Sequence, residues 1–266
     1  MDNKDSKFKS DPYNFSNFLI QENDILNIMK SLNIQDFKIN NLSFYQQAFI
    51  HKSYTKLKDY EEFTKPDNCL ELLDLSYETI EFLGDSLLGN TIAKYLYKRY
   101  INFNIDEGFL TKLKIRFVCG EQLAFLSKQL NFQKYMIISK HIQDNCNGRE
   151  NIHILEDIFE SFLGAIYLDT NNQDLVEQFI IQCIESFIDF SDIILNDNNY
   201  KDQILRYFQH NFKIHPTYRT EKNDSNNLFI CKIFKDNEYI QSGEGISKKK
   251  AEQNASKNAL IHYHVL

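Results

Sequence analysis

Apolar residues recur three and four positions apart through most of the first two thirds of the chain. This spacing is typical of amphipathic helices. It runs from about Ile39 to Phe190 with few glycines, and the only proline in that range, Pro66, lies in a charged connecting stretch. We therefore expect residues 39–190 to form an all-α domain.

Two parts of this region fit the helical pattern less well. Residues 1–38 form an N-terminal extension whose one clear feature is a short amphipathic segment over 24–32. The stretch 54–76 begins loop-like and ends apolar, so it predicts no single element.

The pattern changes after residue 190. Asp and Asn cluster over 191–199, which is the composition of a short linker. Residues 200–266 then predict a small α+β domain of order α-β-β-β-α. The predicted elements are a helix over 200–211, strands over 217–222, 228–234 and 239–245, and a helix from 247 onward, with a hairpin turn at 235–238 and a polar loop at 223–227.

Composition narrows the class of protein. The 266 residues are 42% hydrophobic and 25% charged, which suits a globular chain of two domains. No apolar run approaches the roughly 20 residues of a bilayer span, and the opening residues lack a secretory apolar region. The five cysteines show no C-x-x-C spacing. We expect an intracellular, soluble protein without a membrane partner and with reduced thiols.

Charge is divided unevenly along the chain. Residues 200–266 hold 11 Lys and Arg against 7 Asp and Glu, whereas the rest holds 19 against 30. Such asymmetry is compatible with ordinary scatter, and it also fits a partner with strong charge of its own.

An acidic stripe lies within the apolar segment 77–89. On a helix, Glu78, Glu81 and Asp85 fall within an arc of roughly 60°, and Ile80, Leu83 and Leu87 lie about opposite. We therefore expect one side to pack and the other to present the carboxylates. Glycines at 84 and 89 cost about 1 kcal/mol each in a helix and favour close approach of another backbone or a ligand.

A second stripe occurs over 155–169. Asp157 and Glu160 lie one turn apart, Gly164 continues the stripe, and Phe159, Phe162 and Ile166 form an apolar side. If the two helices pack together, the acids converge, repel one another and take up protons unless a cation lies among them. All-oxygen ligation favours Mg²⁺ or Mn²⁺. Ordinary solvated helix faces explain the stripes equally well from periodicity alone.

These segments resemble the ribonuclease III family. YETIEFLGDS at 77–86 is similar to its signature helix, EDIFESFLGAIYLD at 156–169 to its second acidic helix, and QQAFIHKSY at 46–54 and EGFLTKLK at 107–114 to further family stretches. The C-terminal order with GEGISKKKAEQNASKNAL resembles the double-stranded RNA-binding domain. The resemblance implies an all-α ribonuclease III domain over 39–190, followed by a double-stranded RNA-binding domain over 200–266.

The resemblance also implies functional residues. Glu81, Asp85, Asp157 and Glu160 match the metal-binding catalytic carboxylates, and Glu78 and Glu107 match positions that support the site. Every expected acid is present. We therefore expect Mg²⁺-dependent hydrolysis of double-stranded RNA, with Mn²⁺ able to substitute, leaving 5′-phosphates and short 3′ overhangs.

Family members act as homodimers, so the same assembly through the catalytic domain is expected here. The apolar residues Phe82, Leu87, Phe159 and Phe162 fit either the core or the dimer seam, and the core is the simpler interpretation for each. His51 lies at a helix end, where a structural role is more usual than catalysis.

The C-terminal domain offers candidate RNA contacts. Ser247 is a predicted N-cap, and Lys248 and Lys249 add positive charge at a helix N-terminus, which favours phosphate. Gln203 and Arg206 on the first helix are candidates for the minor groove. The sequence departs from the family at NDSNN, 223–227, where a Gly-Pro-x-His-like turn is usual, and in the longer stretch 55–76, which is a candidate for substrate choice or dimer contacts.

Two alternative functions remain open at this point. A non-catalytic protein that sequesters duplex RNA has no need of intact carboxylates. A metal-dependent hydrolase of nucleotides has no need of the C-terminal domain.

Overall fold

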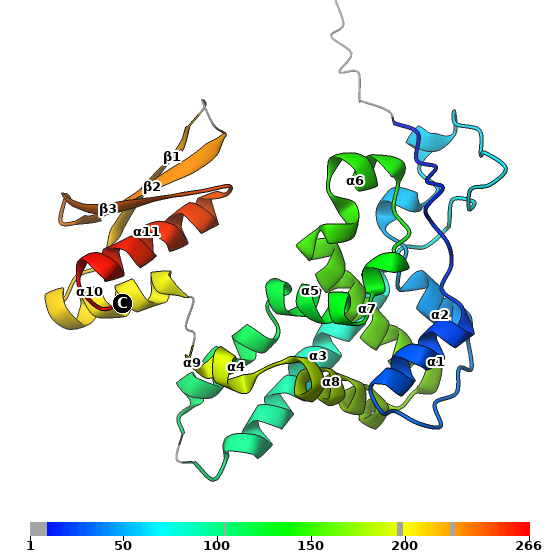
Figure 1. Ribbon diagram of the computed structural model, residues 1–266, viewed down its shortest axis with the longest axis horizontal. Coiled ribbons are helices and arrows are strands. Elements are labelled where there is room, and N and C mark those ends of the chain that lie inside the picture. The colour runs from blue at the N-terminus through cyan, green and yellow to red at the C-terminus, as the bar shows by residue number, and fades with distance from the viewer. Residues whose placement is uncertain (1–9, 104, 196–198, 224–226) are drawn as a thin grey trace, which may run out of the picture. The chain divides into compact units, whose positions relative to one another are not determined.

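The computed structural model describes residues 10–103, 105–195, 199–223 and 227–266. The chain forms two compact units, Met1–Phe190 and Ser191–Leu266 (Figure 1). The described part of the first unit is built of helices, and the second combines helices with a three-stranded sheet. The predicted fold class, an all-α domain and an α-β-β-β-α domain, is confirmed.

The first unit contains α-helices of varied length and short 3₁₀ helices. The α-helices are α1 Glu22–Ser31, α2 Leu42–Gln47, α3 Glu78–Tyr100, α4 Glu107–Phe117, α5 Gly120–Gln129, α6 Lys140–Asn145, α7 Ile152–Thr170 and α8 Gln173–Phe187. The 3₁₀ helices are η1 Lys52–Tyr54, η2 Lys58–Tyr60, η3 Phe132–Lys134 and η4 Gly148–Glu150.

Helix α7 forms the centre of this unit and packs against α3 and α5. Its N-cap is Asn151, whose side chain accepts a hydrogen bond from the backbone N–H of His153 at 3.0 Å, and its C-cap is Asn171, whose φ is 49°. Its middle, from Ile158 to Ile166, is buried on every side. A helix so enclosed is expected to be apolar on most of its faces, and Glu160 and Ser161 are the polar residues of this stretch.

The packed face of α3 differs from the predicted one. Ile80 is buried as expected, but Leu83 and Leu87 are only half-buried, and the buried face continues through Gly84 and Leu88 instead. Helix α7 docks along the glycine because a backbone approaches closely only there. The contact face therefore lies next to the acidic stripe rather than opposite to it.

The exposure of Phe82 also differs from what the sequence predicts. Its side chain is 76% exposed, so the core interpretation is wrong for this residue. Phe159 and Phe162 on α7 are fully buried, as the core interpretation predicts, and Leu87 is intermediate. Phe82 projects from the side of α3 that α7 does not cover.

Part of the N-terminal extension docks on the first unit. The side-chain amides of Asn14 and Asn17 both donate to the backbone carbonyl of Ile138, at 3.1 and 2.9 Å. The Arg149 guanidinium donates to the carbonyl of Gln133 at 2.8 Å and to that of Ser16 at 3.3 Å. Residues 1–9 of the extension lie outside the described part of the chain.

The predicted linker, 191–199, overlaps the short helix α9, Phe190–Leu195, and its residues 196–198 lie outside the described part. The second unit then runs through α10 Tyr200–Phe212, β1 Thr217–Asn223, β2 Leu228–Lys235, β3 Glu238–Gly245 and α11 Lys248–His262.

The strands of the second unit form an antiparallel sheet of order β1-β2-β3, and the two helices lie on one of its faces (Figure 1). The β2–β3 hairpin turns at Asp236 and Asn237, both with positive φ, as a two-residue hairpin turn requires. The core between sheet and helices includes Phe208, Ile233 and Ala255. In neither unit does a described helix have the length and apolar character needed to cross a membrane.

Candidate active site

Helices α3 and α7 approach each other closely because each carries a glycine where they cross. A Cβ atom at Gly84 on α3 would overlap the backbone carbonyl oxygen of Glu160. A Cβ atom at Gly164 on α7 would overlap the carbonyl oxygen of Ile80. A side chain at either position would force the backbones apart, so the two glycines set the spacing of the acidic stripes.

Three of the predicted acids meet at this crossing. Glu81 from α3 and Asp157 and Glu160 from α7 each offer a carboxylate oxygen, and these oxygens lie within 4.8 Å of one another. Glu160 is only 7% exposed, whereas Glu81 and Asp157 are half-buried. Asp85 lies outside this group, exposed and one turn further along α3.

The crowding raises the pKa values of these acids. Burial, together with the negative charge of Asp85, raises the pKa of Glu160 to about 8. Burial and the nearby carboxylates of Asp157 and Asp85 raise the pKa of Glu81, and burial raises that of Asp157. Without a cation, the group therefore retains a proton near neutral pH.

Glu78 and Glu107 are placed differently from the three acids. Glu78 begins α3 and accepts a hydrogen bond from the Lys52 ammonium at 3.1 Å, in an exposed ion pair. Glu107 begins α4 and accepts one from the Thr111 hydroxyl at 2.6 Å. Within the described part of the chain, neither belongs to the group of three, and their supporting roles stay predictions.

Two aromatic side chains lie beside Asp157. The Tyr77 hydroxyl donates a hydrogen bond to Oδ2 of Asp157 at 2.8 Å. The His51 ring packs against Tyr77 with 5.9 Å between ring centroids, and burial lowers the pKa of His51 to about 4. The neutral His51 Nδ1 accepts a hydrogen bond from the Ser53 backbone N–H at 3.1 Å and caps η1. This placement agrees with the structural role expected for His51.

Glu156 is a further acid near the group that the sequence reasoning passed over. It is half-buried, burial raises its pKa, and its negative charge adds to the rise in the pKa of Glu160. Nδ1 of the exposed His153 lies 3.5 Å from Oε2 of Glu156. The available signal was the spacing of four residues between Glu156 and Glu160, which places both on one helix face.

The donor set suits a divalent cation. The three converging ligands are all carboxylate oxygens, which hard ions such as Mg²⁺ and Mn²⁺ prefer. Among the residues that the structure describes, no lysine or arginine forms an ion pair with Glu81, Asp157 or Glu160. The charge of Lys52 acts on Asp157 from a distance, and the rest of the negative charge is left to protons or to a cation from solution.

The second unit presents the predicted phosphate-binding positions at one helix end. The Ser247 hydroxyl accepts a hydrogen bond from the backbone N–H of Lys250 at 3.2 Å, so the predicted N-cap is confirmed. Lys248 and Lys249 in the first turn of α11 are exposed. A helix N-terminus with two exposed lysines attracts anions.

The two predicted RNA-contact residues on α10, Gln203 and Arg206, interact with other groups of the protein. Arg206 is exposed and forms an ion pair with Asp202 of the same helix at 3.0 Å, and Gln203 is half-buried. Exposed pairs of this kind contribute little stability, so the arginine exchanges partners at low cost. In the atypical loop 223–227, residues 224–226 lie outside the described part of the chain. The RNA contacts of this unit therefore stay predictions.

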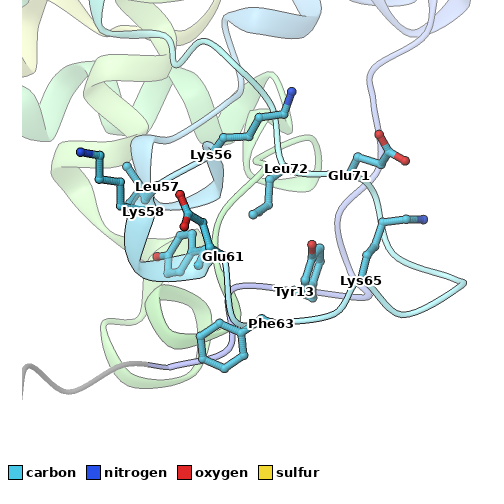
Figure 2. A pocket seen from close by; sticks show the side chains of 10 residues that line it. Tyr13, Lys56, Leu57, Lys58, Glu61, Phe63, Lys65, Glu71 and Leu72 are labelled. Atoms are coloured by element: carbon cyan, nitrogen blue, oxygen red, sulfur yellow. The ribbon is translucent and has the colours of Figure 1, made fainter.

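The unusual stretch 55–76 forms a pocket with the N-terminal extension. Figure 2 shows Tyr13 of the extension beside Phe63 and Lys65 of the stretch. The pocket measures about 540 Å³ and is lined by lysine, glutamate, aromatic and leucine side chains. Lys56 in its wall pairs with Asp74 at 2.7 Å. None of the lining residues is a predicted site residue, and the roles suggested for this stretch stay predictions.

Comparison with known families matches both units. Residues 41–185, more than half of the chain, match a family described as Ribonuclease-III-like, and residues 200–263 match the double-stranded RNA binding motif.

Individual relatives agree with these matches. A probable ribonuclease 3 of Acanthamoeba polyphaga mimivirus is 33% identical over 257 residues, 94% of this chain but 47% of that protein, so the chain spans about half the length of this relative. The ribonuclease 3 of Leptospira interrogans is 34% identical over 223 residues, 83% of this chain and 84% of that protein.

A solved nuclease domain of ribonuclease III from Campylobacter jejuni has the same fold as the first unit. It aligns with a TM-score of 0.50 and 24% identity, over 62% of this chain and 98% of that domain. The family assignment rests on the acidic helices, on the fold of both units and on the family matches. The chain belongs to the ribonuclease III family of enzymes and carries a double-stranded RNA-binding domain after its helical domain.

Proposed function

We propose that this protein is a Mg²⁺-dependent endoribonuclease that hydrolyses phosphodiester bonds of double-stranded RNA and leaves 5′-phosphates with short 3′ overhangs. The main support is the meeting of three carboxylates from α3 and α7 within 4.8 Å. Mn²⁺ shares the preference for oxygen ligands and is expected to substitute. The double-stranded RNA binding motif and the relatives named ribonuclease 3 support duplex RNA as the substrate.

We assign Glu81, Asp85, Asp157 and Glu160 to metal contact, either direct or through water. Glu81, Asp157 and Glu160 are the three whose oxygens converge. Asp85 is exposed, and its negative charge contributes to the raised pKa values of Glu81 and Glu160, so it would contact the ion directly or through water. Glu78 and Glu107 are assigned supporting roles by family resemblance.

A bound divalent ion supplies a nucleophile near neutral pH and stabilises the charge that develops on the leaving 3′-oxygen. The carboxylates of Glu81 on α3 and of Asp157 and Glu160 on α7 would attract and hold this ion. A cation held by these acids would also offset the negative charge that the acidic unit presents to RNA phosphates.

We further propose a homodimer through the catalytic domain, in which each subunit cuts one strand. The C. jejuni nuclease domain is described as having a region involved in dimer formation, and its fold matches the first unit of this chain. Exposed apolar side chains on that unit, Phe82 at 76% and Leu75 at 63%, agree with an interface. Sedimentation of the full chain tests this assembly.

The activity is tested by incubating end-labelled duplex RNA with the full chain and Mg²⁺, beside single-stranded RNA and an EDTA control. We expect cleavage of the duplex alone, only with the metal, to products carrying 5′-phosphates. Duplex binding without cleavage at large enzyme excess would favour a protein that sequesters RNA.

A further inference from the structure

The phenol of Tyr77 is a neutral hydrogen-bond donor that contacts the acidic group. Its hydroxyl donates to Oδ2 of Asp157 at 2.8 Å, across the crossing of α3 and α7. The residue directly precedes α3, whereas Asp157 lies in the second turn of α7. The bond thus links a carboxylate of one acidic helix to the start of the other.

Tyr77 is itself held firmly. Its residue is 3% exposed, and its backbone N–H donates to the carbonyl of Ile50 at 2.8 Å. The backbone carbonyl of Tyr77 accepts hydrogen bonds from Ile80 and Glu81 at 2.9 Å each, which fixes the first turn of α3. The His51 ring packs on one side of the phenol at 5.9 Å. The hydroxyl therefore has little freedom to leave Asp157.

We propose that Tyr77 is a positioning residue that orients the carboxylate of Asp157 for a divalent cation. A carboxylate attached by a single bond rotates unless one oxygen is held, and the phenol holds Oδ2. The oriented carboxylate would then present an oxygen to the ion. Hydrogen bonds of this kind to a ligating carboxylate typically change metal affinity 10- to 100-fold. The inference rests on the proposed function, because it concerns the same metal site.

A second tyrosine–aspartate hydrogen bond to α7 offers a matched control. The Tyr45 hydroxyl donates to Oδ2 of Asp169 at 3.0 Å, near the C-terminal end of α7. Tyr45 is buried like Tyr77, and Asp169 also accepts the backbone N–H of Asn40 at 2.9 Å. Tyr45→Phe therefore removes the same group from the same kind of bond, at a position outside the acidic group.

The experiment uses the full chain with Tyr77→Phe or Tyr45→Phe, and titrates each protein with Mn²⁺ alone by calorimetry in the absence of RNA. We expect Tyr77→Phe to weaken Mn²⁺ binding by roughly tenfold or more and Tyr45→Phe to leave it within about twofold. Circular dichroism checks whether both variants are folded. Equal Mn²⁺ affinity in Tyr77→Phe and the unsubstituted chain would overturn the inference.

Cleavage of duplex RNA as a function of Mg²⁺ gives an independent readout. A positioning role predicts that Tyr77→Phe raises the Mg²⁺ concentration for half-maximal cleavage, and that saturating Mg²⁺ restores most of the maximal rate. A lower maximal rate with an unchanged Mg²⁺ requirement would contradict the positioning role.

The two proposals fail in distinguishable ways. If the unsubstituted chain binds Mn²⁺ and cleaves RNA but Tyr77→Phe behaves identically, only the inference about Tyr77 fails. If the unsubstituted chain binds no Mn²⁺, the proposed function fails and the inference fails with it. In an Asp157→Asn background, Tyr77→Phe should cause no further loss of Mn²⁺ affinity, because the residue acts through Asp157.

Discussion

At the scale of single residues, Glu160 is the most enclosed carboxylate of the three that meet between α3 and α7. Replacing it by Gln keeps its size and removes its charge. We predict that Glu160→Gln lowers Mg²⁺-dependent cleavage by more than about 100-fold, a larger effect than loss of a supporting hydrogen bond. Duplex RNA affinity should change little, because phosphate contacts supply most of the binding. A cleavage assay and a gel-shift assay measure the two effects.

A suitable control for this substitution is Glu150→Gln. Glu150 lies in η4 and pairs with Lys128 at the surface, outside the acidic group. Glu150→Gln should leave both the cleavage rate and the affinity for duplex RNA unchanged. Retained turnover in Glu160→Gln would remove Glu160 from the metal site.

The raised pKa of Glu160 also predicts how stability depends on pH when metal is removed. The pKa of Glu160 is about 8 in the folded chain, against the ordinary glutamate value of 4.5 for the unfolded one. Between these values the folded state binds more protons, so the free energy of unfolding falls as pH rises, by at most about 1.4 kcal/mol per pH unit for one proton. Urea unfolding in EDTA at pH 5 to 8 measures this slope.

Two comparisons isolate the contribution of Glu160 to that slope. Glu160→Gln should reduce this slope, because the amide does not titrate, and the raised pKa values of Glu81, Asp157 and Glu156 account for the slope that remains. Mg²⁺ should stabilise the unsubstituted chain more at pH 8 than at pH 5, since the ion binds the ionised form. If the free energy of unfolding had the same pH slope in Glu160→Gln as in the unsubstituted chain, Glu160 would not be the cause of the pH dependence.

At the scale of elements, the crossing of α3 and α7 depends on glycine. A methyl group at Gly84 would overlap the Glu160 backbone, so we predict that Gly84→Ala destabilises the first unit by about 1–3 kcal/mol, the usual cost of overpacking. It should also weaken Mn²⁺ binding, because the helices that carry the acids are pushed apart. Urea unfolding and calorimetry measure the two losses.

Gly89 on the same helix is the matched control. The nearest atom to a Cβ built there is Nζ of Lys114 at 3.7 Å, which is ordinary contact. Gly89→Ala should therefore stabilise α3, by up to about 1 kcal/mol from helix propensity, and leave metal affinity unchanged. Destabilisation of similar size in both variants would show that the crossing is not the cause.

The same crossing shows what the sequence reveals and what it leaves open. Periodicity located both acidic helices and, with the resemblance, the order of elements in both units. It placed Leu83 and Leu87 on the packed face of α3, whereas α7 docks along Gly84. Periodicity weighs apolar side chains and gives glycine no weight, although close backbone packing depends on the missing side chain.

Side-chain contacts across the site could not be predicted from the sequence either. The bond from Tyr77 to Asp157 joins residues 80 positions apart, and no local pattern encodes such a partner. The exposure of Phe82 depends in the same way on which face of α3 meets α7. Local patterns therefore identified the acids, and tertiary packing decided which of them converge.

At the scale of the whole chain, the two parts carry opposite net charge. Residues 200–266 hold 11 Lys and Arg against 7 Asp and Glu, and the rest holds 19 against 30. A basic part suits an RNA backbone, whereas the acidic part needs a cation to approach one. We therefore expect the second unit to supply most of the salt-sensitive affinity for duplex RNA, and the first unit to supply the chemistry.

This division predicts the salt dependence of binding. For B-DNA, each phosphate neutralised by a lysine adds about 0.9 to the steepness of the slope of log affinity against log salt concentration. Replacing Lys248 and Lys249 by Ala should therefore make the slope less steep by about 2. Binding is measured with Glu160→Gln protein in EDTA, so that no RNA is cut. The double replacement Lys30→Ala, Lys38→Ala removes the same charge from exposed positions of the first unit and should leave the slope unchanged. Equal slopes for the two double variants would mean that the start of α11 does not contact phosphates.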